Sequence, residues 1–288
     1  MPPIQTYLST PSKPHLALPP GACDAHVHVF GPAARFPYAE GRSFTPVDAP
    51  KETLFALHQR MGITRCVIVQ SAVHGFDNRA VEDAIAAGGG RYLGVALVPL
   101  SISDAELARL AAAGFRGVRF NFMRHLVASA GIDEVVAFSQ RLAPLGLHLQ
   151  VHFESALVHV LGERLARSTV PVVIDHIGRV DAALGPDHAD FVALRRLLQN
   201  PLFRIKLSGV DRIASGPEHY AQGVALARLL LQDAPERCFW GSDWPHPNHH
   251  HVPDDGVLVD LLADIAPDAA VRQQLLVDNP LAFYCFPS

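Results

Sequence analysis

The chain has 288 residues, of which 49% are hydrophobic and 18% charged, and its formal net charge is -4. This length and composition are sufficient for one large buried core. No basic tract could neutralise a run of phosphates, which excludes nucleic acid as a partner. No segment approaches the ~20 apolar residues of a membrane helix, so no membrane span is expected.

The first 21 residues contain six prolines and predict an extended arm rather than a helix or strand. They lack the basic start and apolar run of a secretory signal, so we expect a cytoplasmic protein. None of the four cysteines forms a CxxC pair, and we expect buried free thiols in a reducing compartment. No linker divides the remainder, and we expect one domain over residues 22–288.

Eight apolar, β-branched runs follow the arm and predict eight strands. They cover residues 22–30, 66–72, 92–98, 115–122, 148–153, 171–178, 203–209 and 238–245.

Helical periodicity separates these runs, with apolar residues at three- and four-residue steps. It is clearest over Lys51–Met61, Asp104–Ala113 and Glu218–Gln232, and a last helix is expected over Pro267–Val277. Strands that alternate with helices imply parallel pairing, and eight such units predict an α/β protein with a (β/α)₈ TIM barrel. An open doubly wound sheet is the alternative, but the sequence has no Gly-rich dinucleotide fingerprint.

Polar residues interrupt four of the runs where each predicted strand meets its following loop. In the first run, Asp24, His26 and His28 are spaced two residues apart, which predicts that they share one face of the strand. An HxH pair alone is more often a structural pair than a site. The later runs add further imidazoles and carboxylates: His152 with Glu154, Asp175 with His176, and Asp243 in GSDWPHPN. Active sites of such barrels lie at this end, so we expect one shared site.

Three arginines fall near the same rim: Arg119 on the fourth run, Arg179 in DHIGR and Arg212 in SGVDR. A guanidinium group binds a carboxylate through two parallel hydrogen bonds, so their position favours a carboxylate-bearing substrate. Solvated surface arginines are the alternative. We interpret a further run, His249–His251, as solvated surface that could bind a purification metal.

These motifs resemble the amidohydrolase superfamily and, within it, the 2-pyrone-4,6-dicarboxylate lactonase group. The resemblance extends over nearly the whole chain. It rests on TPSKP, GACDAHVHVFGP, VIVQSAVHG followed by Asp77 and Asn78, GVRFNF, VIDHIGR, WGSDWPHPN and VPDDG. HxH is widespread in the superfamily, whereas DAHVHVFGP, DHIGR and GSDWPHPN together are far more specific.

The resemblance implies a hydrolase that opens a carboxylated cyclic ester in the breakdown of lignin-derived aromatics, without a required metal. It implies that Asp243 is the general base and that His26, His28 and His176 hold or polarise the lactone carbonyl. The implied substrate-binding residues are Arg119, Arg179, Arg212, His74, Arg124, His125 and Asn248.

Three positions depart from that family pattern. His152 stands where the family lactonase has tyrosine, His125 where it has arginine, and Ala72 where it has serine. The first change restores a histidine that metal-dependent members use as a ligand. A divalent ion, Zn²⁺ or Mn²⁺, could therefore be held by His26, His28, His152 and Asp243.

Two other functions stay open at this stage: a metal-dependent decarboxylase of the same superfamily, and a non-catalytic barrel that binds a small acid. The expected partner is a small carboxylated lactone, and the sequence gives no oligomeric state. A decarboxylase would release carbon dioxide, whereas a lactonase releases a proton. A binding protein would need no general base.

Overall fold

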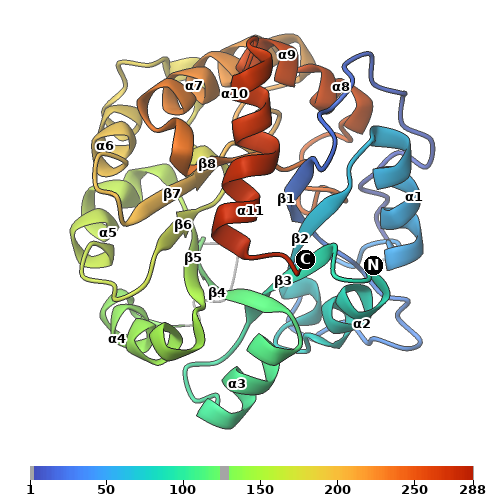
Figure 1. Ribbon diagram of the computed structural model, residues 1–288, viewed down its shortest axis with the longest axis vertical. Helices are drawn as coiled ribbons and strands as arrows, with labels where there is room; N and C mark the ends of the chain where they lie inside the picture. Colours follow the sequence, from blue (N-terminus) through green and yellow to red (C-terminus); the bar gives the residue numbers. More distant parts are fainter. Residues whose placement is uncertain (1–2, 124–129, 288) are drawn as a thin grey trace.

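The computed structural model describes residues 3–123 and 130–287. Its centre is an eight-stranded sheet in which neighbouring strands pair in parallel, in the order β1 to β8, with helices around it (Figure 1). The strands are β1 Cys23–Val27, β2 Arg65–Val69, β3 Tyr92–Leu97, β4 Phe115–Phe122, β5 His148–Phe153, β6 Val172–Ile174, β7 Phe203–Lys206 and β8 Cys238–Phe239. Each predicted run holds one strand, and the predicted TIM-barrel class is confirmed.

Main-chain hydrogen bonds between the segment after β8 and β1 close the barrel. The amide of Ala25 donates to Trp240 O at 2.8 Å, and the amide of Asp243 donates to His26 O at 2.8 Å. Because the second bond involves Asp243 itself, barrel closure also fixes a predicted site residue to the strand that carries His26.

The helices follow the strands in chain order. Their bounds are α1 Lys51–Met61, α2 Arg79–Ala87, α3 Asp104–Ala112, α4 Ile132–Leu142, α5 Val158–Leu165, α6 Ala189–Leu197, α7 Tyr220–Asp233, α8 Asp255–Asp260, α9 Leu262–Ile265, α10 Ala269–Gln273 and α11 Asn279–Tyr284. The expected first helix is confirmed to the residue, and those at α3 and α7 are confirmed to within two residues at each end.

The expectation of one last helix over Pro267–Val277 was wrong. Helix α10 gives way to a π-helical stretch, Gln274–Asp278, and α11 then continues to Tyr284. Pro280 lies in the first turn of α11, where its missing N–H costs no helical hydrogen bond. The helical path therefore continues past Val277 to Tyr284.

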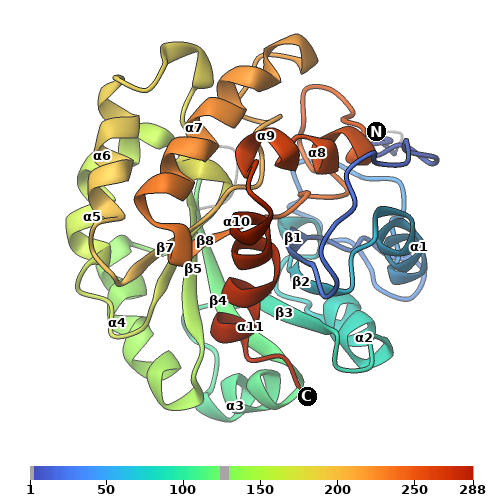
Figure 2. The same ribbon diagram turned by 45° about the horizontal axis from the view of Figure 1, so that its top comes forward.

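Two of the three hydrophobic clusters among the described residues form the barrel core. The larger packs the outer faces of the strands against the helices, and a smaller one fills the lower barrel around Ala25, Val95 and Phe239. Helix α11 lies across that end of the barrel (Figures 1 and 2), and its Tyr284 ring packs 5.1 Å from that of Phe239. One end of the barrel is thereby closed, which leaves the opposite end for a site.

Residues 3–22 form neither a helix nor a strand, apart from an isolated bridge between Ile4 and Pro46. Asp254 accepts a hydrogen bond from the Ser12 amide at 2.9 Å, and Asp260 accepts bonds from the amides of His15 and Leu16. The segment is thus held against the region of α8.

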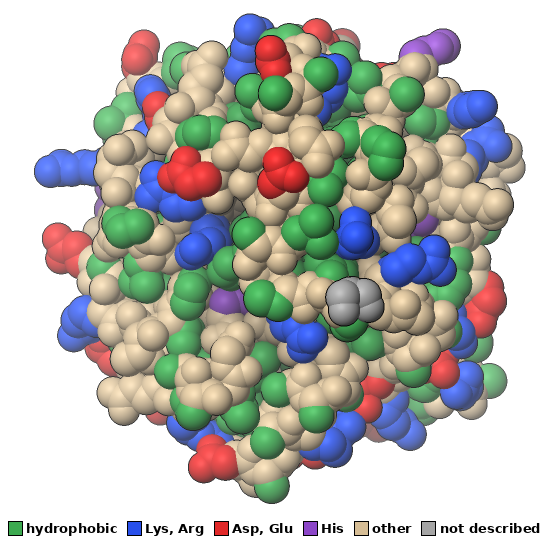
Figure 3. All heavy atoms as spheres, viewed as in Figure 1, with side chains coloured by type: hydrophobic (Ala, Val, Ile, Leu, Met, Phe, Trp, Pro, Cys, Tyr) green, Lys and Arg blue, Asp and Glu red, His purple; other side chains and the backbone are tan. Residues whose placement is uncertain are grey.

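The surface and the thiols match most expectations. Acidic and basic side chains are interspersed over the face in Figure 3, and no helix among the described residues is long and apolar enough to cross a bilayer. Three cysteines are buried and free, whereas Cys285 is exposed, which corrects the expectation that all four are buried. Cys285 follows the end of α11 rather than lying in a strand.

Gly117 on β4 provides a test of the packing in the lower barrel. A Cβ atom at this position would lie 2.4 Å from the His148 ring on the neighbouring strand. We expect Gly117→Ala to lower the unfolding free energy by about 1–3 kcal/mol, because a packed core cannot absorb the extra methyl group. Chemical denaturation measures the effect. Gly41→Ala is the control, since Gly41 is exposed and a Cβ atom added there would meet no other atom within 4 Å. Equal stability of the two variants would contradict the tight packing at Gly117.

Candidate active site

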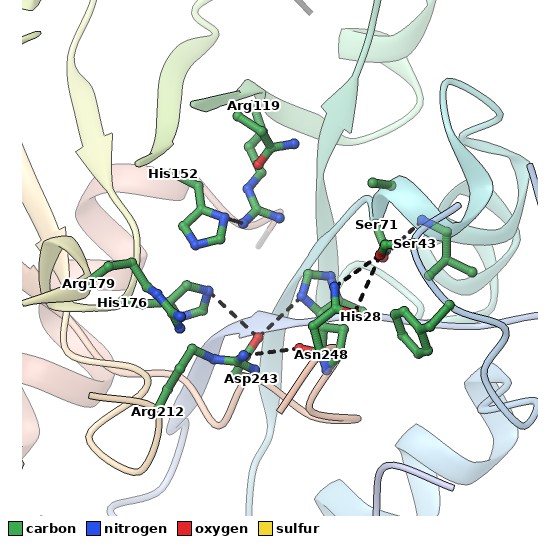
Figure 4. A pocket seen from close by; sticks show the side chains of 15 residues that line it. His28, Ser43, Ser71, Arg119, His152, His176, Arg179, Arg212, Asp243 and Asn248 are labelled. Atoms are coloured by element: carbon green, nitrogen blue, oxygen red, sulfur yellow. Dashed lines mark hydrogen bonds and ion pairs between the residues drawn. The ribbon is translucent and has the colours of Figure 1, made fainter. Parts of the chain in front are cut away.

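The open end of the barrel contains a cavity at the C-terminal ends of the strands (Figure 4). Arginine, histidine, serine and asparagine side chains surround one aspartate. The lining residues are His28, Ser43, Phe44, Ser71, Ala72, Val73, Arg119, Asn121, His152, His176, Arg179, Arg212, Asp243, Pro247 and Asn248. The cavity lies where the barrel architecture positions chemistry.

Asp243 is the centre of the cavity. Its Oδ1 lies 3.2 Å from His28 Nε2, 3.7 Å from His26 Nε2 and 3.8 Å from His176 Nε2, and its Oδ2 pairs with Arg212 Nη2. The carboxyl group is buried. Three imidazoles and a guanidinium thus converge on one carboxylate.

A β-bulge decides which residues of the HxH motif reach this carboxylate. The register between β1 and β2 shifts between Asp24 and Val27. Asp24 accepts hydrogen bonds from the amide and hydroxyl of Ser242 and lies 3.8 Å from His58 on α1, so it does not join His26 and His28. The expectation that all three share one face was wrong, because a bulge breaks the alternation of side chains and re-aims them.

A second buried carboxylate, Asp175, lies beneath Asp243. Its Oδ2 forms an ion pair with Arg119 Nε at 2.9 Å and accepts a hydrogen bond from Gln150 Nε2 at 3.1 Å. Its Oδ1 lies 3.7 Å from the ammonium group of Lys206, which donates to Gln150 Oε1 at 2.8 Å. Sequence reasoning missed Lys206, although a lysine inside the apolar run FRIKLSG was the available signal, because a buried lysine needs a partner.

The charges of these groups follow from burial and from their neighbours. Burial alone would raise the pKa of Asp243, but Arg212, His176, His28 and His26 outweigh it and hold that pKa well below its usual range. Burial likewise opposes ionisation of Asp175, whose pKa is nevertheless lowered by Arg119 and Lys206. Both carboxylates are therefore ionised at neutral pH.

The imidazoles and Lys206 respond in the opposite way. Burial lowers the pKa of His26, His152 and His176 well below its usual range, so these rings are neutral at pH 7. Burial also lowers the pKa of Lys206 to about 8. Hydrogen bonds at Nδ1 orient two of the rings in the cavity: His176 Nδ1 lies 3.0 Å from Ser208 Oγ, and His28 Nδ1 donates to Val69 O at 2.7 Å.

Strained loops carry several of these side chains. Non-glycine residues with positive φ concentrate after β6 and β8; they are His176, Ile177, Arg179, Asp243, His246 and Asn248. A β-branched residue such as buried Ile177 at φ 54° is an unusual conformation. Such strain is retained at sites that need fixed side-chain directions. DHIGR and GSDWPHPN are thus the segments that aim His176, Arg179 and Asp243 into the cavity.

The three arginines predicted as carboxylate anchors lie in the cavity wall but differ in their contacts. Arg119 is held by Asp175 and His152, and Arg212 by Asp243 and by Pro247 O, which it meets at 3.0 Å. Arg179 forms no ion pair with a described residue, and burial beside Arg212 lowers its pKa to about 10. Arg179 is therefore the guanidinium most available to a ligand.

Other predicted binding residues are distributed differently. Asn248 lines the cavity beside Ser43. His74 does not line it, because both ring nitrogens bind main-chain groups, the Gly31 amide and Pro37 O. Arg124 and His125 lie outside the described residues.

The interpretation of His249–His251 as solvated surface holds only for His250. His249 Nε2 lies 2.7 Å from buried Asp211, and His251 Nε2 lies 2.5 Å from the Tyr220 hydroxyl. Ser43 and Ser71 line the cavity, and sequence reasoning missed both. The available signals were weak: Ser43 lies near a loop glycine, and Ser71 lies in the QSA run.

The predicted metal ligands are only partly brought together. Among the described residues, the ligand atoms of His26, His28 and Asp243 lie within 4.8 Å of one another, as do those of His26, Asp175 and His176. His152 belongs to neither group. Imidazole and carboxylate donors suit Zn²⁺ or Mn²⁺, but the cations Lys206, Arg119 and Arg212 contact the same carboxylates and do not fit a further divalent charge beside them.

The fold and the cavity define a (β/α)₈-barrel protein with a histidine- and aspartate-centred site. A family model described as amidohydrolase matches residues 23–286. The chain belongs to the amidohydrolase family.

Two relatives of this chain are named as hydrolases of lactone-type compounds. This chain is 44% identical to a 2-pyrone-4,6-dicarboxylate hydrolase of Comamonas testosteroni, over 96% of this chain and 94% of that protein. It is 40% identical to a 4-sulfomuconolactone hydrolase of Hydrogenophaga intermedia, over 91% and 88%.

Solved structures of similar fold contain ligands. A probable 2-pyrone-4,6-dicarboxylic acid hydrolase from Acinetobacter baumannii, with citric acid bound, aligns with a TM-score of 0.81 at 25% identity, over 92% of this chain and 100% of that one. An amidohydrolase from Burkholderia multivorans contains zinc and aligns with a TM-score of 0.68 at 22% identity, over 94% and 100%. Some members of this fold therefore hold zinc.

The neutral histidines predict how stability depends on pH. Their folded pKa is lowered, so below pH ~6.5 the unfolded chain binds protons that the folded chain does not, and stability falls as the pH falls. His152→Gln removes one such group. We expect the slope of unfolding free energy between pH 6 and 5 to decrease by up to about 1.4 kcal/mol per pH unit.

Chemical denaturation of wild type and variant at several pH values measures this difference. His250→Gln is the matched control, because that side chain is exposed. Identical slopes in wild type and His152→Gln would show that the His152 ring is not held neutral.

Proposed function

We propose that this protein hydrolyses a carboxylated cyclic ester, such as 2-pyrone-4,6-dicarboxylate, to an open-chain acid. The observation that carries the proposal is the buried, ionised Asp243 at the centre of an arginine-rich cavity. It is supported by relatives at 44% and 40% identity that are named as hydrolases of such lactones. A small carboxylated lactone is the corresponding partner.

The charges around the cavity favour a dianionic substrate. Four cationic side chains line or underlie it, Arg119, Arg179, Arg212 and Lys206, against the two carboxylates that contact them, Asp175 and Asp243. Two negative groups on a ligand would balance this excess. Arg179 is the first anchor, because it lines the cavity and its guanidinium forms no ion pair with another described residue. The citrate bound to the Acinetobacter relative is also a small polycarboxylate.

Asp243 would act as the general base for the attacking water. Its Oδ1 faces the cavity imidazoles, while Arg212 binds Oδ2. A base with a strongly lowered pKa is weak, and a substrate carboxylate that recruits Arg212 would raise its basicity as the water is positioned. The proton moves from water to Asp243 and the water oxygen bonds to the lactone carbonyl carbon. The ring C–O bond then breaks, and the departing ring oxygen takes the proton from Asp243, which regenerates the base.

Asp243→Asn tests the base directly, because it preserves size and removes basicity. We expect kcat to fall by about 10²–10⁴-fold, the range of general base catalysis. The assay follows proton release and carbon dioxide separately, since a lactonase releases a proton and a decarboxylase releases carbon dioxide. Near-full hydrolysis by a folded Asp243→Asn variant would refute the role of the base.

Arg179→Ala tests the anchor. We expect a strong rise in KM for a dicarboxylated lactone and little change for a neutral one, since an unpaired buried carboxylate costs on the order of 2–5 kcal/mol. Arg164→Ala is the control, because Arg164 pairs with Asp133 at the surface. Assays with 2-pyrone-4,6-dicarboxylate and 4-sulfomuconolactone distinguish the anion preferred. An equal effect on charged and neutral lactones would exclude Arg179 as a carboxylate anchor.

A further inference from the structure

Two histidines of the site share an arrangement that differs from that of a metal ligand. In each, ring nitrogen Nδ1 is the acceptor of a cation. Arg119 Nη2 donates to His152 Nδ1 at 2.9 Å, and Lys206 Nζ donates to His26 Nδ1 at 3.3 Å. Guanidinium and ammonium groups can only donate, so Nδ1 carries no proton in either ring.

The position of the remaining proton follows. A neutral imidazole with an unprotonated Nδ1 carries its hydrogen on Nε2. Among the described residues, Nε2 of His26 and Nε2 of His152 are both buried and have no hydrogen-bond partner. Each ring therefore presents an unused N–H donor at the barrel opening.

A competing acceptor beside His26 sharpens this assignment. Asp175 Oδ1 lies 3.2 Å from His26 Nδ1, close enough to accept a proton from it, yet within the described chain this oxygen has no hydrogen bond. The Nδ1 lone pair is bonded to Lys206 instead. Lys206 thus keeps His26 in the Nε2–H tautomer, whereas Asp175 alone would favour the Nδ1–H tautomer.

We propose that Lys206 and Arg119 are positioning residues that commit His26 and His152 to the Nε2–H tautomer, which makes them hydrogen-bond donors rather than metal ligands. His152 lines the cavity (Figure 4), so its Nε2–H can donate to the carbonyl oxygen where negative charge develops. His26 Nε2, 3.7 Å from Asp243 Oδ1, directs its proton toward the base.

The same assignment bears on metal binding. A ligating histidine must offer an unprotonated nitrogen to the ion, and His26 Nε2, the atom on the side of His28 and Asp243, is protonated. The charges in this site therefore do not favour a zinc ion like the one bound by the Burkholderia protein. Lys206 and Arg119 supply internal positive charge at the place where an ion would otherwise supply it.

The direct test is NMR of ring-¹⁵N-labelled histidine, which distinguishes the two tautomers by the shifts of their ring nitrogens. In wild type we expect His26 and His152 as Nε2–H tautomers, assigned with the single variants His26→Gln and His152→Gln. In Lys206→Met we expect His26 to change to Nδ1–H with Asp175 as acceptor, whereas His152 keeps its tautomer because Arg119 is intact. His152 is thus an internal control in the same spectrum.

Two further measurements separate positioning from a merely structural role. With Nε2 of His26 freed, Zn²⁺ binding to Lys206→Met, measured by competition with a chromophoric chelator, should tighten by about 10- to 100-fold, the range that outer-shell partners of histidine ligands control. Lys206→Gln keeps a neutral donor and should retain the wild-type tautomer and affinity. Lys51→Met is the matched control, because Lys51 pairs with Asp83 and Glu52 away from the site.

The kinetic consequence rests on the proposed lactone hydrolysis: kcat should fall in Lys206→Met while KM changes little, since Lys206 does not line the cavity. The tautomers and the zinc affinity need no substrate, so they stand or fall separately from that activity. An Nδ1–H tautomer of His26 in the wild type, or an unchanged tautomer in folded Lys206→Met, would overturn the proposal. So would a zinc affinity in Lys206→Met equal to that of the wild type.

Discussion

Two carboxylates, Asp175 and Asp243, lie buried at the open end of the barrel, and the arrangement of the site depends on keeping both charged. An isolated buried carboxylate would take up a proton, because a low-dielectric interior disfavours its charge. Here Arg119 and Lys206 offset the charge of Asp175, and Arg212 offsets that of Asp243. These ion pairs are therefore a condition for keeping the two buried carboxylates charged, more than a source of stability.

Sequence patterns predicted the barrel because parallel strands and helices have distinct periodicities, and they predicted the site because polar residues interrupted the strands at one end. They could not predict the bulge that separates Asp24 from His26, since a bulge depends on pairing with β2 rather than on local composition. They also missed Lys206, whose role exists only through contacts with residues distant in the chain. The last helix was predicted to end at Val277, whereas the structure continues through a π-helical stretch and α11 to Tyr284, with Pro280 in the first turn of α11.

The loops that follow β6 and β8 explain how so few residues create the site. His176, Arg179 and Asp243 all adopt left-handed backbone conformations, which a flexible loop would not hold. Two anchors restrain the Asp243 segment: its amide bonds to β1, and the Ser242 hydroxyl bonds to Asp24. The bulge excludes Asp24 from the cavity, and Asp24 contributes instead by fixing the position of Asp243.

Arg119 connects the buried carboxylate to the cavity wall, since its guanidinium contacts Asp175 through Nε and His152 through Nη2. This link gives a physical reason for histidine at a position where the resembling lactonase has tyrosine. A tyrosine hydroxyl can rotate to donate to a substrate without help, whereas a neutral histidine donates from Nε2 only if Nδ1 is unprotonated. Arg119 ensures that condition, and Asp175 holds Arg119 in place. The replacement therefore preserves a hydrogen-bond donor at the cavity wall, and the arginine that stabilises the buried carboxylate also determines which nitrogen of His152 bears the proton.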